Sequence, residues 1–253
     1  MLKYKNVPIY DQAAFKGIKA AGVLAYQVLE YIKDYIKVGV SLEELDKLCE
    51  DYIRKHNAIP ATLGYLGYPK STCISLNHEV CHGIPNEVQL QEGDILNIDV
   101  TVIKDGWFGD TSRMFKVEKV SDLANRLIAT TKLCLDEAVK IVKPGCHLGD
   151  IGAVIQAIAH KNNFSIVEEY CGHGIGSSFH HEPSILHYGR FGEGMQLKEG
   201  MVFTIEPMIN AGKKETEELK NGWTVVTKDR SLSAQFEHTL GVTKDSAVIF
   251  TLP

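Results

Sequence analysis

The sequence predicts an α+β fold made of two similar halves. Two apolar segments, residues 90–100 and 197–207, are near copies of each other. Each places one carboxylate, Asp99 or Glu206, at the same step of a strand-like run. A pattern that occurs twice, about a hundred residues apart, indicates a duplicated half-domain rather than a solenoid of short repeats.

The repeat also predicts the order of elements within each half. An amphipathic run after a glycine-containing turn occurs twice, and so does a short loop with a His-Gly pair; the matching segments are residues 37–57 with 143–163, and 80–84 with 171–175. Each half is therefore expected to run helix, turn, helix, His-Gly loop and antiparallel strands. We expect residues 1–253 to form a single domain with halves of roughly 12–118 and 119–250.

Composition favours one compact enzyme. The chain has 253 residues, a net charge of −5 and no linker-like segment, which gives no basic footprint for nucleic acid and no polybasic membrane patch. Its first residues lack an apolar signal segment, so a cytoplasmic location is expected. The six cysteines include no Cys-x-x-Cys pair, and reduced thiols are predicted.

A predicted hairpin brings two acidic side chains together. Strands at residues 94–103 and 107–117 flank Lys104-Asp105-Gly106, a turn signal. Depending on which two residues form the loop, Asp99 lies either directly opposite Asp110 or diagonal to it on the same face. Both registers call for a bridging cation or a shared proton, unless Asp110 lies on a solvated face.

The second half supplies further candidate ligands. Glu206 ends an apolar strand, Glu237 lies in the strand-like run 235–242, and His173 lies between two glycines. Four carboxylates and one imidazole suit two hard or borderline divalent ions and argue against copper or a thiolate zinc site.

One motif match is misleading. Residues 78–82 read His-Glu-Val-Cys-His, which fits the zinc-peptidase motif that requires a helix. The flanking residues favour strand and loop, so His78 and His82 need not converge. A helical zinc site would make His78 essential, whereas it is dispensable under the prediction preferred here.

Seven ordered blocks resemble the type I methionine aminopeptidases, and the resemblance covers nearly the whole chain. The blocks begin at residues 81, 97, 109, 172, 179, 204 and 236 and read CHGIP, NIDV, GDTS, GHGIG, FHHEP, TIEP and FEHT. The resemblance implies the pita-bread fold, in which two pseudo-symmetric halves cover an antiparallel sheet with helices.

The resemblance also implies a dinuclear metal centre. Asp99, Asp110, His173, Glu206 and Glu237 match the five ligands, with Asp110 and Glu237 bridging the two ions. The ions would be Co, Mn, Fe, Zn or Ni, and they would activate a water molecule and polarise the scissile carbonyl. A monovalent cation is implied near three further positions, namely Asn97, Val100 and Ser233.

Catalytic and substrate-binding roles follow from the same resemblance. Glu206 would act as general base, His180 would stabilise the tetrahedral oxyanion, and His82 would contact the scissile amide nitrogen. With these two histidines, an apolar slot would bind the substrate methionine; its four matching residues are Tyr65, Cys73, Phe179 and Trp223. Without the resemblance, these four read as ordinary core residues.

The implied substrates are nascent polypeptide N-termini, met at the ribosome, with a small second residue preferred. A monomer without direct nucleic-acid or membrane binding is expected. The chain departs from common family patterns at Leu66, at Ser177 and Ser178, and at His181. None of these is a predicted ligand.

Two alternatives share the implied fold. A prolidase or Pro-specific aminopeptidase would use the same five ligands but usually carries an extra amino-terminal domain. A non-catalytic module that binds RNA or ribosomes would be expected to lose ligands, and all five are present here.

Overall fold

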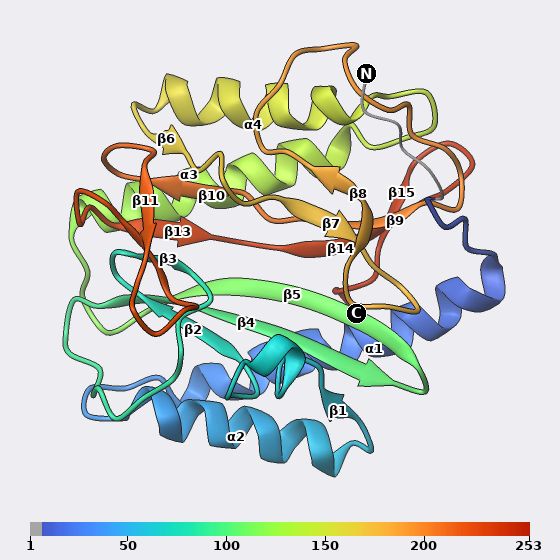
Figure 1. Cartoon of the computed structure of the whole chain (residues 1–253). Coiled ribbons are helices and arrows are strands. Elements are labelled where there is room, and N and C mark those ends of the chain that lie inside the picture. Colours follow the sequence, from blue (N-terminus) through green and yellow to red (C-terminus); the bar gives the residue numbers. More distant parts are fainter. Residues whose placement is uncertain (1–6) are drawn as a thin grey trace.

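The computed structural model describes residues 7–253. Helices form two outer layers, and antiparallel sheets lie between them (Figure 1). The α+β class predicted from the sequence is confirmed. Residues 1–6 lie outside the described part of the chain. The prediction that the first residues form no signal segment concerns these residues.

The first half places two helices against one sheet. Its elements are α1 (Gln12–Ile32), η1 (Lys33–Tyr35), α2 (Leu42–Lys55), β1 (Ile59–Pro60), η2 (Tyr65–Gly67), β2 (Cys73–Leu76), β3 (Glu79–Cys81), β4 (Ile95–Lys104) and β5 (Trp107–Lys116). Strand β4 pairs with β1, β2 and β5. α1 begins where the side chain of Asp11 accepts a hydrogen bond from the Ala14 N–H at 2.9 Å. α2 begins with a capping box formed by Ser41 and Glu44.

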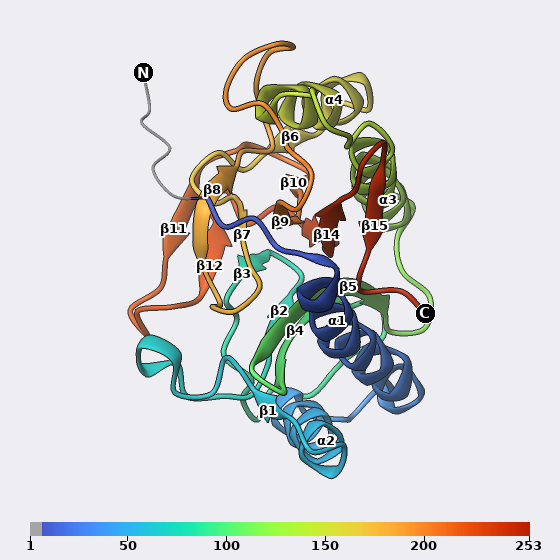
Figure 2. The same ribbon diagram turned by 90° about the vertical axis from the view of Figure 1, so that its right-hand side faces the viewer.

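The second half has a similar helix pair on the opposite side. Its elements are α3 (Asp122–Lys140), α4 (Leu148–Lys161), β6 (Ser165–Ile166), β7 (Gly172–Gly174), β8 (His181–Ile185), β9 (Val202–Ile205), β10 (Met208–Asn210), β11 (Thr216–Glu218), β12 (Val225–Thr227), β13 (Ser233–Gln235), β14 (His238–Val242) and β15 (Ala247–Ile249). One sheet has the order β15–β14–β9–β7–β8 and another β13–β10–β6. A third sheet joins the halves, because β12 pairs with both β11 and β3 (Figure 2).

Two turns, one in each predicted half, make matching backbone contacts. The Gly39 N–H donates to the Leu90 carbonyl at 2.8 Å, and the Gly145 N–H donates to the Leu197 carbonyl at 3.0 Å. Two residues further on, matching isolated bridges form, Ser41 with Gln89 and His147 with Gln196. The helices that follow, α2 and α4, both span 14 residues. The same turn and helix start are therefore built twice.

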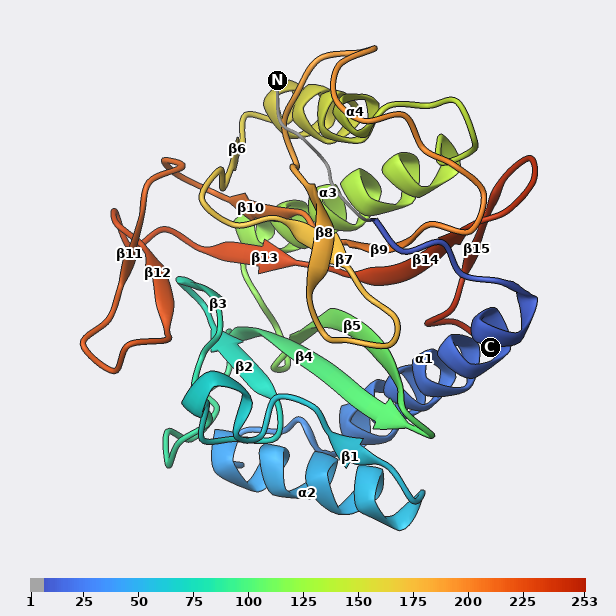
Figure 3. The same cartoon turned by 45° about the vertical axis from the view of Figure 1, so that its right-hand side comes forward.

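Each helix pair packs on the sheet of its own side. α1 and α2 share one buried cluster with β4, which includes Val28, Leu45 and Ile98. α3 and α4 share another with β9, which includes Leu135 and Phe203. Fully burying a side chain of this size contributes about 1.5–3 kcal/mol. Strands of the two halves therefore face each other in the middle of the molecule (Figure 3).

The β4–β5 hairpin resolves the open register. Lys104 pairs with Trp107, so the loop is Asp105-Gly106, and both loop residues have positive φ (51° and 82°), as a type I′ hairpin turn requires. Asp99 therefore lies opposite Ser112, and Asp110 lies diagonal to Asp99 on the same face. The diagonal alternative is correct.

The His-Glu-Val-Cys-His segment is not helical. Residues 79–81 form β3, His78 lies in the preceding turn and His82 has a positive φ of 55°. The helical zinc site is therefore excluded by the backbone. All six cysteine thiols are free, as predicted. Among residues 7–253, no helix combines the length and apolar character needed to span a membrane.

Candidate metal centre and surrounding pocket

All five predicted metal ligands line one cavity of about 410 Å³. Asp99 comes from β4, Asp110 from β5 and His173 from β7. Glu206 follows β9, and Glu237 lies in the two-residue gap between β13 and β14. The prediction of one continuous strand over residues 235–242 is therefore wrong. The ladder breaks at Glu237, whose N–H donates instead to the Ser112 carbonyl of β5 at 3.1 Å.

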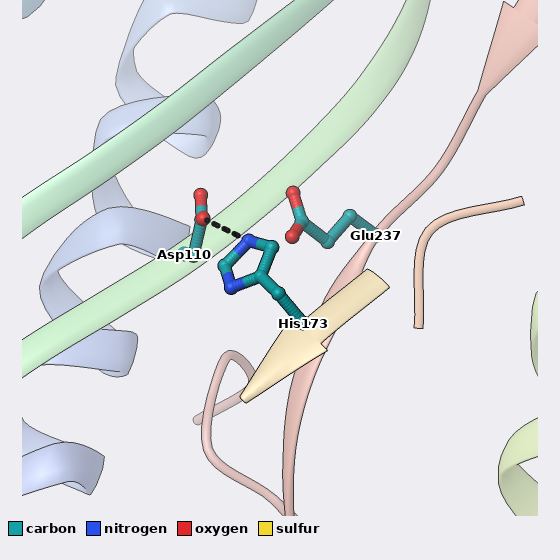
Figure 4. A group of neighbouring side chains, drawn as sticks. All are labelled: Asp110, His173 and Glu237. Carbon is teal, nitrogen blue, oxygen red and sulfur yellow. Dashed lines mark ion pairs between the residues drawn. The ribbon is translucent and has the colours of Figure 1, made fainter. Parts of the chain in front are cut away.

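Three of these side chains meet closely. One potential ligand atom each of Asp110, His173 and Glu237 lies within 4.8 Å of the other two (Figure 4). The His173 Nε2 lies 3.6 Å from Asp110 Oδ2 and 3.7 Å from Glu206 Oε1. Ligand types and spacing of this kind suit a divalent cation.

The carboxylates lie close together, Asp110 and Glu237 buried and Asp99 and Glu206 partly buried, which disfavours their charged forms. Burial raises the pKa of Asp99 and of Glu237 well above the usual range, and neighbouring carboxylates, Asp110 foremost, raise both further. Burial likewise raises the pKa of Glu206 to about 7, although His173 opposes the shift. Without a bound cation, some of these carboxyl groups must be protonated.

The donor set fits divalent metal ions. Within the described residues, Asp99 Oδ1 is buried without a hydrogen-bond partner, as expected of an atom meant for a ligand. Burial alone would lower the pKa of His173, but the neighbouring carboxylates of Asp110 and Glu206 raise it overall. A raised pKa means that the imidazole holds a proton more tightly, and a metal ion bound by His173 would replace that proton.

Three polar residues that the sequence analysis did not identify orient the ligands. The Thr101 hydroxyl donates to Asp110 Oδ1 at 2.7 Å, and the Thr204 hydroxyl donates to Glu206 Oε1 at 2.8 Å. The Gln235 amide donates to Glu206 Oε2 at 3.1 Å. Thr101 pairs directly with Asp110 across the hairpin. Its contact with Asp110 could have been predicted if the sequence had allowed only this register. Supporting bonds of this kind fix ligand orientation.

His187 is another site residue that the sequence analysis missed. It is fully buried, and its Nε2 accepts the Glu206 backbone N–H at 3.2 Å. Burial lowers the pKa of His187 to about 3, so the ring is neutral at pH 7. An accepting Nε2 assigns the ring proton to Nδ1. His187 therefore fixes the backbone at a predicted ligand.

His180 lies at the edge of the ligand cluster. Its Nδ1 lies 2.9 Å from the Tyr65 hydroxyl, and its ring centroid lies 4.1 Å from that of His173. The side chain lines the cavity and is exposed to solvent. Desolvation, followed by the charge of His173, lowers the pKa of His180 to about 4. The imidazole is therefore neutral near pH 7.

His82 faces the same cavity from the opposite half of the sequence. Its ring meets Tyr170 edge-on at a centroid distance of 5.6 Å and Trp223 at 6.2 Å. Burial lowers the pKa of His82 below its usual value. A neutral ring next to an apolar wall can donate or accept a hydrogen bond without a charge.

The four predicted slot residues line this cavity too. Phe179 stacks on His180 at 4.1 Å and packs against Tyr65 at 4.7 Å. Cys73 pairs with Asp99 across β2 and β4, and Trp223 lies near Tyr68. The wall next to the carboxylates is thus aromatic and sulfur-bearing, a surface on which a thioether packs well.

The three predicted monovalent-cation positions lie outside the cavity lining. Asn97 and Val100 are on β4, and Ser233 starts β13. All three are buried. The Asn97 amide donates to the Gln235 carbonyl at 2.8 Å, and the Ser233 hydroxyl donates to Asn210 Oδ1 at 2.8 Å.

The fold and this cluster of potential metal ligands suit a metallopeptidase, and comparison with known proteins agrees. The model of metallopeptidase family M24 matches residues 16–244. A methionine aminopeptidase of Rickettsia prowazekii is 56% identical over 248 residues, which cover 98% of this chain and 96% of the relative. The chain belongs to metallopeptidase family M24, and within it to the methionine aminopeptidases.

Solved structures confirm the pita-bread fold. The crystal structure of methionine aminopeptidase from R. prowazekii has a TM-score of 0.97 at 55% identity, with 98% of this chain and 100% of that chain covered. The enzyme from Thermotoga maritima has a TM-score of 0.96 at 34% identity and the same coverage. A prolidase from Pyrococcus horikoshii shares the fold, with a TM-score of 0.77 at 20% identity over 96% of this chain and 63% of that chain.

Proposed function

We propose that this chain removes the initiator methionine from nascent proteins by metal-dependent hydrolysis and prefers a small second residue. The observation that carries the proposal is the 56% identity to a methionine aminopeptidase over 98% of the chain. The cavity supports it, because the predicted ligands, catalytic histidines and slot residues all line one space.

The metal centre would be held by residues of both halves. Asp99, Asp110, His173, Glu206 and Glu237 would bind two divalent ions. Co, Mn, Fe, Zn and Ni all suit these ligands. When bound, the ions would polarise the scissile carbonyl and lower the pKa of a bound water.

Glu206 and His180 would handle protons and developing charge. Glu206, whose pKa burial raises to about 7, would take a proton from the attacking water and return it to the leaving amine. If the Tyr65 hydroxyl donates to His180 Nδ1, the ring proton lies on Nε2 and can bind the developing oxyanion. His82 would contact the scissile amide nitrogen.

Substrate choice would come from the apolar wall. The methionine side chain would lie against Tyr65, Cys73, Phe179 and Trp223, which surround a space of suitable polarity. The carboxylates beside this apolar wall would bind the free α-amine of a substrate. The enzyme would therefore cleave only at the amino terminus, as an exopeptidase.

Several wider features belong to the same proposal. The enzyme would act on N-termini as they leave the ribosome, as a cytoplasmic monomer without direct nucleic-acid or membrane contact. Residues 12–118 and 119–250 would be duplicated halves of one catalytic domain. A monovalent cation near Asn97, Val100 and Ser233 would support the β4–β13 region.

The test is methionine release from Met-Ala-Ser by protein stripped with chelator and then titrated with Mn or Co, with Ala-Pro-Ser in parallel. Metal-dependent release from the Met peptide alone is expected. Cleavage of only the Pro peptide would move the assignment to a prolyl aminopeptidase. No cleavage with any metal would favour the non-catalytic module.

A further inference from the structure

Tyr10, just before α1, contacts the loop that carries Phe179 and His180. The Tyr10 hydroxyl lies 3.3 Å from the Ser177 hydroxyl, 3.1 Å from the Ser177 N–H and 3.3 Å from His181 Nε2. These contacts join residues more than 160 positions apart in the sequence. Loop 176–181 is thus held at both ends by one side chain.

The hydrogen-bond directions at this hydroxyl can be assigned. His181 Nδ1 lies 2.6 Å from the Glu182 carbonyl, which can only accept, so Nδ1 carries a proton. In the neutral ring, Nε2 is then an acceptor and the Tyr10 O–H donates to it. The Tyr10 oxygen is left to accept from the Ser177 N–H and hydroxyl. All three bonds are thereby satisfied at once.

Tyr10 is itself firmly held. Its N–H donates to the Gly200 carbonyl at 2.8 Å, and its ring meets Trp107 edge-on at a centroid distance of 5.9 Å. The loop backbone approaches the ring so closely that a Cβ at Gly176 would lie 2.4 Å from a ring carbon. Only glycine permits this contact.

Few residues separate the clamped points from His180. Ser178, Phe179 and His180 are all that lie between Ser177 and His181. The Phe179 ring stacks on Phe108 of β5 at 5.8 Å, and the His180 ring stacks on Phe179 at 4.1 Å. If Ser177 and His181 lost their contacts with Tyr10 and moved, the His180 imidazole between them would therefore be displaced as well.

We propose that Tyr10 is a positioning residue for His180, acting through its hydroxyl on loop 176–181. The proposal rests on the proposed role of His180 as an oxyanion donor.

The kinetic test is Tyr10→Phe, which removes the hydroxyl and keeps the ring, made both in the unmodified protein and in a His180→Ala background. In the first, we expect kcat for Met-Ala-Ser to fall about tenfold with KM unchanged, because a small displacement of a catalytic group costs rate rather than ground-state binding. In the second, Tyr10→Phe should leave kcat unchanged. The matched control is Ser178→Ala, whose hydroxyl makes no hydrogen bond among the described residues.

A second readout needs neither metal nor turnover. In metal-free protein, hydrogen exchange of the Ser177 amide should speed up about tenfold in Tyr10→Phe and stay unchanged in Ser178→Ala, because that amide donates to the Tyr10 oxygen. His181→Ala removes the acceptor of the Tyr10 O–H and leaves the Tyr10 oxygen in place. If Tyr10→Phe does not fold, His181→Ala should reproduce the loss of kcat, while the Ser177 amide keeps its acceptor and its exchange rate.

The outcomes separate this proposal from the proposed function. Unchanged kcat in Tyr10→Phe, an equal loss in both backgrounds, or unchanged Ser177 exchange would overturn the positioning role while methionine release by the unmodified protein stands. If the unmodified protein releases no methionine, both proposals fall, even where exchange at Ser177 still depends on Tyr10.

Discussion

At the scale of single residues, Glu206 combines the most roles. Its carboxylate receives hydrogen bonds from Thr204 and Gln235, its backbone N–H is held by His187, and burial raises its pKa to about 7. Glu206→Gln keeps the shape but removes the basic oxygen. We expect kcat to fall about 10²–10⁴-fold, the range for a lost general base.

The control for this substitution is Glu199→Gln, an exposed position seven residues upstream. It should leave kcat unchanged. Steady-state kinetics with saturating Mn would measure both variants. A Glu206→Gln protein that keeps a tenth or more of the activity would rule out the general-base role.

The residue scale also explains what the sequence could and could not predict. Asp99 and Glu206 are conspicuous because a carboxylate in an apolar strand needs a partner. Thr101, Thr204 and Gln235 are inconspicuous, because threonine and glutamine are ordinary strand residues whose role depends on register. The contacts of Tyr10 could not be predicted from local sequence, because they depend on how Tyr10 packs against loop 176–181, which is distant in the sequence.

At the scale of elements, one cross-element ion pair links α1 to β5. Glu30 lies 2.7 Å from Lys33 and 2.5 Å from Arg113 of β5, and the bonds to Lys33 and then Arg113 lower its pKa to about 2. A depressed pKa in the folded state stabilises the fold above the usual value near 4.5, and this contribution is lost as pH falls toward 2. Because the group is largely solvated, about 0–1 kcal/mol is expected.

Glu30→Gln should therefore lower the free energy of unfolding slightly at pH 7, and the difference from the unmodified protein should shrink as pH falls from 4.5 toward 2. Urea titrations at several pH values would measure it. Asp51→Asn, which breaks an exposed pair within α2, is the matched control and should have a smaller effect. A Glu30→Gln difference that grows at low pH would contradict the assignment.

Turns set the limits of prediction at this scale. The sequence signal Lys104-Asp105-Gly106 allowed two hairpin registers, and positive φ at the last two residues selects one of them. The run 235–242 looked like one strand because its residues favour strands throughout. It breaks at Phe236 and Glu237 because Glu237 pairs across the halves with β5, a tertiary contact that local preference does not contain.

At the scale of the whole molecule, the predicted ligands come from both halves. Asp99 and Asp110 lie on the first sheet, whereas His173, Glu206 and Glu237 lie in the second half. Metal binding should therefore stabilise the pairing of the halves as well as the site. Ligand that binds only the folded state at a hundred times its Kd adds about 2.7 kcal/mol.

For a chain of this length, such a gain corresponds to a rise in Tm of roughly 5–10 °C. Thermal unfolding of chelator-treated protein, with and without added Mn, would measure it. Asp110→Asn, which removes one predicted ligand, should gain far less from Mn than the unmodified protein does. Equal Tm values with and without saturating Mn would mean that these carboxylates do not form a metal site, and their burial would then have to be balanced by protons alone.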